Sequence, residues 1–265
     1  MFTKEQLKKQ MAEMGLKADD TVLIHTSMRA IGPVEGGADG VIDAFCEYLS
    51  EGLFIVPTHT WGTVSPAHPV YDVRTEKPCI GALPCAAAFR SDGVRSMNAT
   101  HSVWAHGARA AEFVAGEESV YNGTAPQSCW GRLKDENAKI LLIGVGNERN
   151  TFIHAVEETI GVPDRTGKLF ELTHIYADGH ARKGSIKPHS CSKCPDVSAN
   201  FPNFEKPFNV LGVQHFGQLG NAGVRVVDAA RCAAVVTMLW QKADYDLCVQ
   251  RREIPEEYYL ESAGE

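Results

Sequence analysis

Three short, uninterrupted apolar runs constrain the fold of this chain more than any other feature. They cover residues 21–25, 52–57 and 139–144. Runs of this length and composition are typical of strands that are buried on both faces, as parallel strands are. Segments with apolar residues at helical spacing lie between and after them. This alternation predicts a layered α/β fold in which helices flank a mostly parallel central sheet.

The remaining elements complete this pattern. The spacing of apolar residues predicts helices over residues 3–16, 38–49, 81–90, 151–160 and 229–241, and a further strand over 224–228. In residues 168–188, apolar and polar side chains alternate on either side of an Asp178-Gly179 pair. This pattern is typical of a β-hairpin. Residues 58–80 and 189–209 are expected to be loops. No linker or repeat is evident, so we expect residues 1–265 to form a single domain, with a hairpin and loop embellishment over about 168–209.

Composition narrows the class of function. The 26 Lys and Arg residues against 33 Asp and Glu residues give a net charge of −7, whereas nucleic-acid binding favours a basic excess. No run approaches the ~18 apolar residues of a membrane helix, and the charged N-terminus lacks an apolar signal core. We therefore expect a cytoplasmic protein with a small-molecule substrate. Its negative net charge modestly favours a cationic substrate. The eight cysteines are too sparse for a disulfide scaffold.

The first candidate site follows the first apolar run, between His25 and Asp39. Hydroxyl groups and the pair Gly36-Gly37 stand here between a strand and a helix start. Ligands of open α/β sheets bind beyond the carboxyl ends of strands, where helix N-termini offer free N–H groups to phosphate. The alternative is a connection that needs glycine only for its turns.

A second candidate follows the run at residues 139–144. The glycines at 144 and 146 resemble a dinucleotide fingerprint, but Arg149 replaces its third glycine. His154 falls in the first turn of the next helix, with Glu157 three residues on. A carboxylate at that spacing could orient an imidazole acting as a general base. The alternative is an ordinary surface pair.

Two further segments carry polar groups. Residues 95–107 form a loop rich in hydroxyl, His and Trp side chains, which could border a site or simply lead into a strand. His189, Cys191 and Cys194 could provide part of a zinc site, completed by a distant His180 or His215. Because a lone C-x-x-C does not secure four ligands, a pair of loop thiols is the favoured interpretation.

Together these segments resemble one family. Residues 21–32 and 35–44 are similar to the opening motif of the aminoglycoside 3-N-acetyltransferases, the antibiotic N-acetyltransferases that are distinct from the GNAT fold. Residues 139–154 are similar to its second signature, 95–107 to a third, and 220–222 to a short fourth. Order and spacing fit over about residues 5–240.

The resemblance implies acetyl-CoA as donor, an amine as acceptor and direct transfer that requires no metal. His154 matches the family's catalytic histidine, and Glu157 the acidic residue beside it. Backbone N–H groups near Thr26-Ser27 or Gly36-Gly37 are candidate donors to the oxyanion. The coenzyme A-binding residues are then expected to be His25, Thr26, Ser27, Arg29, Ala30, Ile31, Gly32, Gly36, Gly37, His101 and Ser102.

The acceptor side departs from the family pattern. Asn98-Ala99 stands where the third motif often carries His-Pro, and the segment from His189 to Cys194 is not typical of the resistance enzymes. A polycationic aminosugar needs several carboxylates for its capture. The candidate acceptor-binding residues are Asp72, Glu76, Asn98, Glu158 and Asp164.

Three functions are consistent with these features. The leading hypothesis is transfer of an acetyl group from acetyl-CoA to the 3-amino group of an aminoglycoside or a related amine, with His154 as general base and a role in antibiotic resistance. The second is a zinc-dependent hydrolase that uses His154, Glu157 and the His189/Cys191/Cys194 segment. The third is a non-catalytic acyl-CoA binder. A homodimer is compatible with all three.

Overall fold

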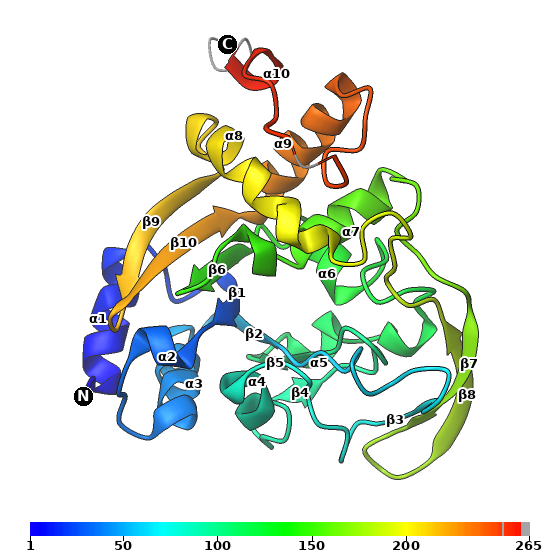
Figure 1. Cartoon of the computed structure of the whole chain (residues 1–265). Helices are drawn as coiled ribbons and strands as arrows, with labels where there is room; N and C mark the ends of the chain where they lie inside the picture. The colour runs from blue at the N-terminus through cyan, green and yellow to red at the C-terminus, as the bar shows by residue number, and fades with distance from the viewer. Residues whose placement is uncertain (251, 261–265) are drawn as a thin grey trace.

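A seven-stranded sheet forms the centre of the computed structural model, which describes residues 1–250 and 252–260 (Figure 1). The strand order is β4-β5-β2-β1-β6-β10-β9. The middle strands β2 (Leu53–Pro57), β1 (Thr21–Thr26) and β6 (Lys139–Ile143) correspond to the three apolar runs and are parallel to one another. The prediction of a layered α/β fold with parallel strands at its centre is confirmed.

The outer strands of this sheet run antiparallel to their neighbours. On one side β5 (Val103–His106) pairs with β2, and β4 (Val94–Arg95) pairs with β5. On the other side β10 (Ala222–Asp228) pairs with β6, and β9 (Gln214–Leu219) pairs with β10. The sheet is therefore mixed, which the apolar runs alone did not indicate.

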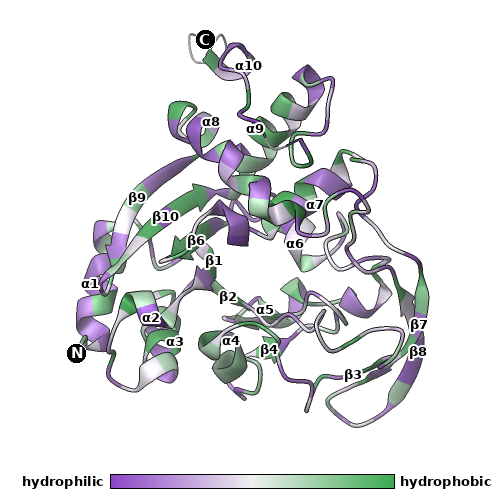
Figure 2. Cartoon of the chain, viewed as in Figure 1, coloured by the Kyte–Doolittle hydropathy of each residue, from purple (hydrophilic) through white to green (hydrophobic). Residues whose placement is uncertain are grey.

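Helices cover both faces because successive strand residues point to opposite sides. Val22 and Leu141 pack into a core beneath α1 (Lys4–Glu13), α3 (Gly37–Tyr48) and α4 (Ala82–Ala87). Leu23 and Leu142 belong to the opposite core. That second core is covered by α5 (Ala110–Phe113), α6 (Cys129–Arg132), α7 (Phe152–Thr159), α8 (Glu205–Val210) and α9 (Ala229–Lys242). Figure 2 shows apolar residues concentrated in strands β6 and β10.

The predicted hairpin is present as part of a second, smaller sheet. Strands β7 (Phe170–Ile175) and β8 (Ala181–Ile186) are antiparallel, and Gly179 adopts the positive φ that their turn requires. Strand β3 (Val70–Asp72) adds in parallel to β7. Figure 1 shows this small sheet along one side of the molecule, away from α9.

Both segments expected to be loops contain regular structure. Residues 58–80 include β3, whose three residues are too few to show a period. Residues 189–209 include a 3₁₀ helix, η3 (Val197–Phe204), and all but the last residue of α8. Pro202 lies inside η3. Pro207 lies in the first turn of α8, where a missing backbone N–H costs little. The expectation that residues 189–209 form only a loop is therefore wrong.

Short elements complete the chain. They are the helices α2 (Met28–Ile31) and α10 (Glu257–Leu260) and the 3₁₀ turns η1 (Glu117–Ser119) and η2 (Asn147–Arg149). Within the described residues, no helix combines the length and apolar character that a bilayer crossing demands.

The central strands predict where stability resides. Leu141 in β6 is fully buried, whereas Leu169 is 57% exposed. Leu141→Ala should lower the free energy of unfolding by about 2–5 kcal/mol, because it removes a buried side chain and leaves a cavity. Leu169→Ala should change it by no more than about 0.5 kcal/mol. Urea denaturation of both variants measures the difference; equal effects would contradict the assignment of β6 to the core.

Candidate active site

A cavity of about 560 Å³ opens at the carboxyl ends of the parallel strands. His25 and Thr26 at the end of β1, and His59 just after β2, form part of its wall. Polar groups from loops at this edge complete it, as expected for an open α/β sheet. Five imidazoles line the cavity: His25, His59, His101, His154 and His189.

His154 lies in the first turn of α7, with its side chain on the cavity. Its Nδ1 lies 3.1 Å from Oε2 of Glu157, one turn further along the helix. Its ring packs against Phe201, at 4.7 Å between centroids, and against His189, at 4.0 Å. His154 is 8% exposed, so the two neighbouring rings and the carboxylate of Glu157 hold its imidazole in one orientation.

A chain of buried ionic contacts continues behind Glu157. Oε1 of Glu157 accepts a hydrogen bond from Nε of Arg165 at 2.9 Å, and Nη2 of Arg165 contacts both oxygens of Asp246 at 3.0 Å. Burial disfavours the charged guanidinium, but Glu157 and Asp246 outweigh burial and raise the pKa of Arg165. Glu157 is fully buried, so this partner is what compensates its charge.

The other four imidazoles are held in their neutral form. Burial lowers the pKa of His25 to about 3 and that of His189 to about 2. Burial also lowers the pKa of His59 and His101 well below the usual value, and nearby histidines add to the effect. At neutral pH these rings offer hydrogen-bonding groups without positive charge.

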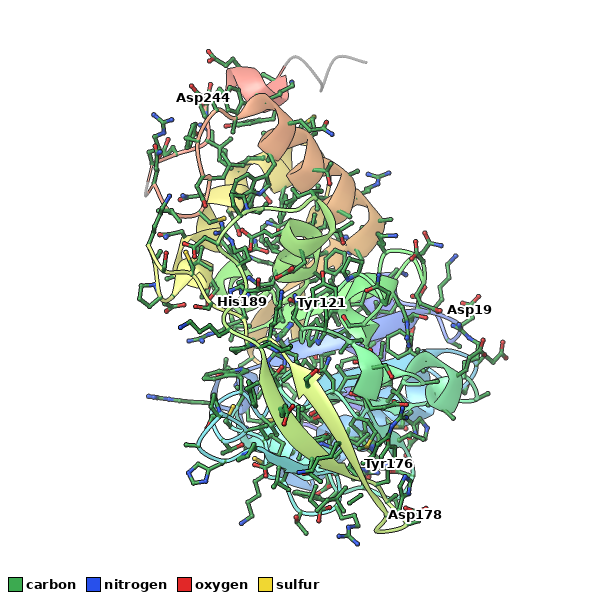
Figure 3. The ribbon with its side chains drawn as sticks, turned by 90° about the vertical axis from the view of Figure 1, so that its right-hand side faces the viewer. Asp19, Tyr121, Tyr176, Asp178, His189 and Asp244 are labelled. Atoms are coloured by element: carbon green, nitrogen blue, oxygen red, sulfur yellow. The ribbon has the colours of Figure 1, made fainter. Side chains whose placement is uncertain are left out.

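Several of these nitrogens have no partner within the described part of the chain. They are Nε2 of His25, Nε2 of His59 and both ring nitrogens of His189. Buried polar atoms are normally hydrogen-bonded, so four unpaired nitrogens on side chains that line one cavity are exceptional. Figure 3 shows His189 where the hairpin joins the body of the molecule, whereas Asp178 lies at the hairpin tip.

The residues predicted to bind coenzyme A are only partly brought together. His25, Thr26 and His101 line the cavity. Ser27 instead caps α2 and Ser102 hydrogen-bonds to Thr58, both within the protein. The others do not line this cavity: Arg29, Ala30 and Ile31 in α2, Gly32 at its end, and Gly36 and Gly37 at the start of α3. The three glycines adopt positive φ, which the turns between α2 and α3 require.

Two of the backbone N–H groups suggested as oxyanion donors already donate hydrogen bonds within the protein. The backbone N–H of Ser27 donates to Ile143 at 2.9 Å, and that of Gly37 donates to Val34 at 3.0 Å. These two groups are therefore unavailable to a substrate, because strand pairing and the turn before α3 already use them.

The five candidate acceptor-binding residues lie outside the cavity lining. Asp72 is paired with Arg74, and Asp164 accepts hydrogen bonds from the backbone and hydroxyl of Ser192. Asn98 is fully buried, and its amide group bonds Glu117 and the backbone of Gly123 and His101.

The remaining two, Glu76 and Glu158, are half-buried. Burial raises the pKa of Glu158, and its Oε1 lies buried away from the cavity lining. Glu158 lies in α7 rather than in a loop. Sequence patterns do not show whether carboxylates from different elements converge.

The suggested zinc ligands do not converge. Sγ of Cys191 contacts Arg165 and Asp164, and Sγ of Cys194 accepts from Asn200. Among the described residues, the group of three whose donor atoms lie within 4.8 Å of one another is Cys46, Asp92 and His106.

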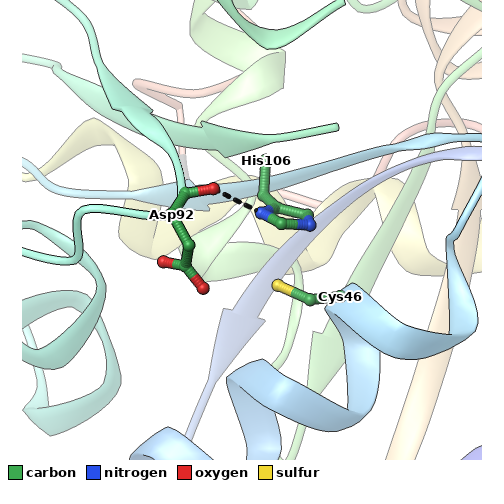
Figure 4. Close-up of side chains that lie close together, drawn as sticks. All are labelled: Cys46, Asp92 and His106. Atoms are coloured by element: carbon green, nitrogen blue, oxygen red, sulfur yellow. Dashed lines mark hydrogen bonds between the residues drawn. The ribbon is translucent and has the colours of Figure 1, made fainter. Parts of the chain in front are cut away.

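That group lies apart from the cavity lining, and its donors are already engaged. Nδ1 of His106 contacts the backbone oxygen of Asp92 at 2.6 Å (Figure 4). The carboxylate of Asp92 is paired with Arg90. Burial raises the pKa of the Cys46 thiol to about 12, which opposes the thiolate that a metal requires.

Comparison with known proteins decides the family. The family model described as aminoglycoside 3-N-acetyltransferase matches residues 23–241. The chain belongs to the aminoglycoside 3-N-acetyltransferase family. It is 31% identical over 228 residues to aminoglycoside N(3)-acetyltransferase VII of Streptomyces paromomycinus, covering 79% of each chain. It is 26% identical over 179 residues to the acetyltransferase-like protein YokD of Bacillus subtilis, covering 60% of this chain and 65% of YokD.

Solved structures show the same fold. AAC-IIIb in binary complex with CoASH superimposes with a TM-score of 0.78 at 21% identity, covering 96% of this chain and 98% of that one. AAC-VIa bound to sisomicin gives a TM-score of 0.74 at 20% identity, covering 92% and 98%. The protein is thus an acyltransferase of this family, and the hypotheses of a zinc hydrolase and of a non-catalytic binder are set aside.

Sequence reasoning missed several groups at this aminoglycoside 3-N-acetyltransferase site. His59 and Trp61 were expected to lie in a loop with no assigned function. Polar residues directly after a buried strand nevertheless indicate a possible ligand site. Arg165 and Asp246 are 81 residues apart. No local spacing connects them, so only the fold reveals their pairing.

The neutral imidazoles predict acid sensitivity. Because the pKa of His25 falls from about 6.5 unfolded to about 3 folded, only the unfolded state takes up its proton between these values. Stability should therefore fall as pH drops below about 6.5, by about 1 kcal/mol per pH unit for each such histidine.

His25→Gln should reduce the slope of unfolding free energy against pH by about that amount between pH 6 and 5. His68→Gln, at an exposed position, serves as the control and should leave the slope unchanged. Urea titrations at each pH provide the measurement. An unchanged slope in His25→Gln would mean that His25 is not buried in its neutral form.

Proposed function

We propose that this protein transfers the acetyl group of acetyl-CoA to an amino group of an aminoglycoside or a related amine. The observation that carries the proposal is the buried pair His154–Glu157, 3.1 Å apart, on the wall of a cavity at the sheet's carboxyl edge. Its support is twofold: membership of the N-acetyltransferase family and a geometry suited to deprotonating an amine.

The proposed step is direct transfer. Nδ1–H of His154 donates to Glu157, which leaves Nε2 with the lone pair that accepts a proton. As the acceptor nitrogen attacks the thioester carbonyl, Nε2 takes the proton from that nitrogen. The C–N bond forms, the C–S bond breaks, and the leaving coenzyme A thiolate takes the proton that Nε2 accepted, which returns His154 to its neutral form. Imidazole is suited to this role because its usual pKa lies near neutrality.

Glu157 and Arg165 have distinct parts in this proposal. The carboxylate of Glu157 fixes the tautomer of His154 and stabilises the imidazolium that forms. Arg165 touches no reacting atom; it holds Glu157 from behind through a 2.9 Å contact. It is a positioning residue, and Asp246 in turn fixes its guanidinium.

The donor and acceptor are proposed to meet at His154. His25 and Thr26 end the central strand β1 and form the coenzyme A side of the cavity, as the opening motif of the family suggests. His59, His189 and Trp61 also line the cavity. Trp61 is 54% exposed, which suits an aromatic side chain at the entrance of a cavity.

Replacing His154 tests the base. His154→Ala should lower turnover by about two to four orders of magnitude, the usual effect of removing a general base. The affinity for acetyl-CoA, measured by calorimetry, should stay close to that of the wild type. Product formation should be followed by mass spectrometry, with acetyl-CoA and a panel of amines, because eight thiols would confuse a thiol-reactive dye.

The exposed His180 at the hairpin turn provides a matched control. His180→Ala should acetylate the same amine at the wild-type rate. Acetylation at the 3-amino position by the wild type is the expected product. Near-normal turnover in His154→Ala would show that another group acts as base.

A further inference from the structure

Attack on a thioester places negative charge on the carbonyl oxygen, and an effective site supplies that oxygen with hydrogen-bond donors. His154 is committed to the attacking nitrogen. The backbone N–H groups of Ser27 and Gly37 already donate within the protein, and Gly36 does not line the cavity. A donor to the oxygen is therefore expected among the side chains that line the cavity near His154.

His101 lines the same cavity as His154 and is 6% exposed. Burial lowers the pKa of His101 well below the usual value, and the nearby His189 and His154 lower it further. His101 therefore stays neutral while His154 carries a proton, and a neutral imidazole keeps one N–H group to donate. Within the described residues Nε2 of His101 has no hydrogen-bond partner, and it is not among the unpaired nitrogens that are buried inside the protein.

The neighbouring Thr100 decides which nitrogen of His101 carries the hydrogen. Oγ1 of Thr100 lies 3.0 Å from Nδ1 of His101, and Thr100 is 1% exposed. A buried hydroxyl group needs an acceptor for its proton, and in the described part of the chain Nδ1 is the acceptor that Oγ1 reaches. Nδ1 of His101 therefore accepts, and Nε2 carries the hydrogen.

Contacts from three other segments hold His101 in place. Oδ1 of Asn98 accepts the backbone N–H of His101 at 2.9 Å, and the amide group of Asn98 donates to the backbone oxygen of Gly123 at 2.9 Å. Gly123 packs directly on the ring, since a Cβ atom at this position would lie 2.1 Å from Nδ1. Nε1 of Trp130 donates to the backbone oxygen of His101 at 2.8 Å. The ring is thus fixed before substrate binds, as a preorganised donor must be.

We propose that His101 is a further catalytic residue, whose Nε2–H donates a hydrogen bond to the thioester oxygen of acetyl-CoA while the acceptor nitrogen attacks. This inference rests on the proposed acetyl transfer and deepens it. No proton leaves His101: the hydrogen bond strengthens as negative charge develops on the oxygen and weakens when the C–S bond breaks. Thr100 touches no reacting atom; it is a positioning residue, because its hydroxyl group sets the tautomer of His101.

The tautomer can be measured without turnover. NMR spectra that correlate the carbon-bound ring protons of histidine with its ¹⁵N-labelled nitrogens distinguish the two neutral tautomers, and His101→Gln assigns the signals of His101 by their loss. The expected result is a neutral ring with its hydrogen on Nε2 at neutral pH. A hydrogen on Nδ1 instead, or a positively charged ring, would overturn the inference.

The second test removes the donor. His101→Leu should lower kcat about 100- to 1,000-fold, the usual effect of losing one donor to an oxyanion. His101→Gln keeps an N–H group near the position of Nε2, so its kcat should be at least about tenfold higher than that of His101→Leu.

The affinity for coenzyme A, measured by calorimetry, shows whether His101 does more than bind the donor. Coenzyme A lacks the acetyl carbonyl, so its Kd should stay within about threefold of the wild-type value in both variants. This result also shows that the variants are folded. A weakened affinity for coenzyme A with an unchanged kcat would contradict a catalytic role for His101.

Thr100 offers a matched pair of variants. Thr100→Val keeps the shape of the side chain without its hydroxyl group, whereas Thr100→Ser keeps the hydroxyl group. We expect kcat to be at least about tenfold higher in Thr100→Ser than in Thr100→Val, and the NMR signals of His101 in Thr100→Val to show loss of the Nε2–H tautomer. Equal kcat values and unchanged signals would refute the role of Thr100.

These results separate the inference from the proposed function. Acetylation of an amine by the wild type, together with a wild-type kcat in His101→Leu, would refute the role of His101 and retain acetyl transfer. Absence of acetylation with every amine tested would refute acetyl transfer and the role of His101 with it, although the tautomer measured by NMR would stand.

Discussion

The buried contact between Glu157 and Arg165 is the interaction on which the site depends. A fully buried carboxylate is stable as an anion only with a compensating partner, and Arg165 provides it. The anion orients His154, and His154 faces the cavity. Asp246 closes the series at the far side. Behind the imidazole of His154, an acidic, a basic and a second acidic side chain thus follow one another, and each holds the next in a single orientation.

The sheet explains why these groups meet at one place. Three parallel strands end at the same edge, and β1 brings His25 and Thr26 there while β6 leads into the turn before α7. The helix then carries His154 back over this edge. Four further imidazoles surround the space, and burial keeps them uncharged. The result is a polar cavity with little charge of its own, in which a base can act beside neutral hydrogen-bonding groups.

Much of this architecture could be predicted because it is local. The runs at residues 21–25, 52–57 and 139–144 predicted the central strands, and Asp178-Gly179 predicted the hairpin turn. The spacing of His154 and Glu157 predicted their pairing, since three residues on a helix place two side chains on one face.

The other features of the fold and the site depend on contacts between residues that are far apart in the sequence, and no local sequence pattern predicts such contacts. The antiparallel edge strands, η3 and the approach of His189 to His154 arise from tertiary packing. The carboxylates chosen for the acceptor do not line the cavity for the same reason. Asp72 is paired with the nearby Arg74, and Asp164 is held by Ser192, 28 residues away. The sequence shows which residues are charged but not where their side chains point.

The position of Asp246 has a consequence for the boundaries of the functional unit. This residue follows α9 and lies beyond residues 23–241, the range that the family model matches. A fragment trimmed to that range would lose α1 and the first two residues of β1, but it would retain His154, Glu157 and Arg165. It would nevertheless leave the buried guanidinium with one acidic partner instead of two. The segment after α9 therefore contributes to the network behind His154, although Asp246 lies outside the sheet.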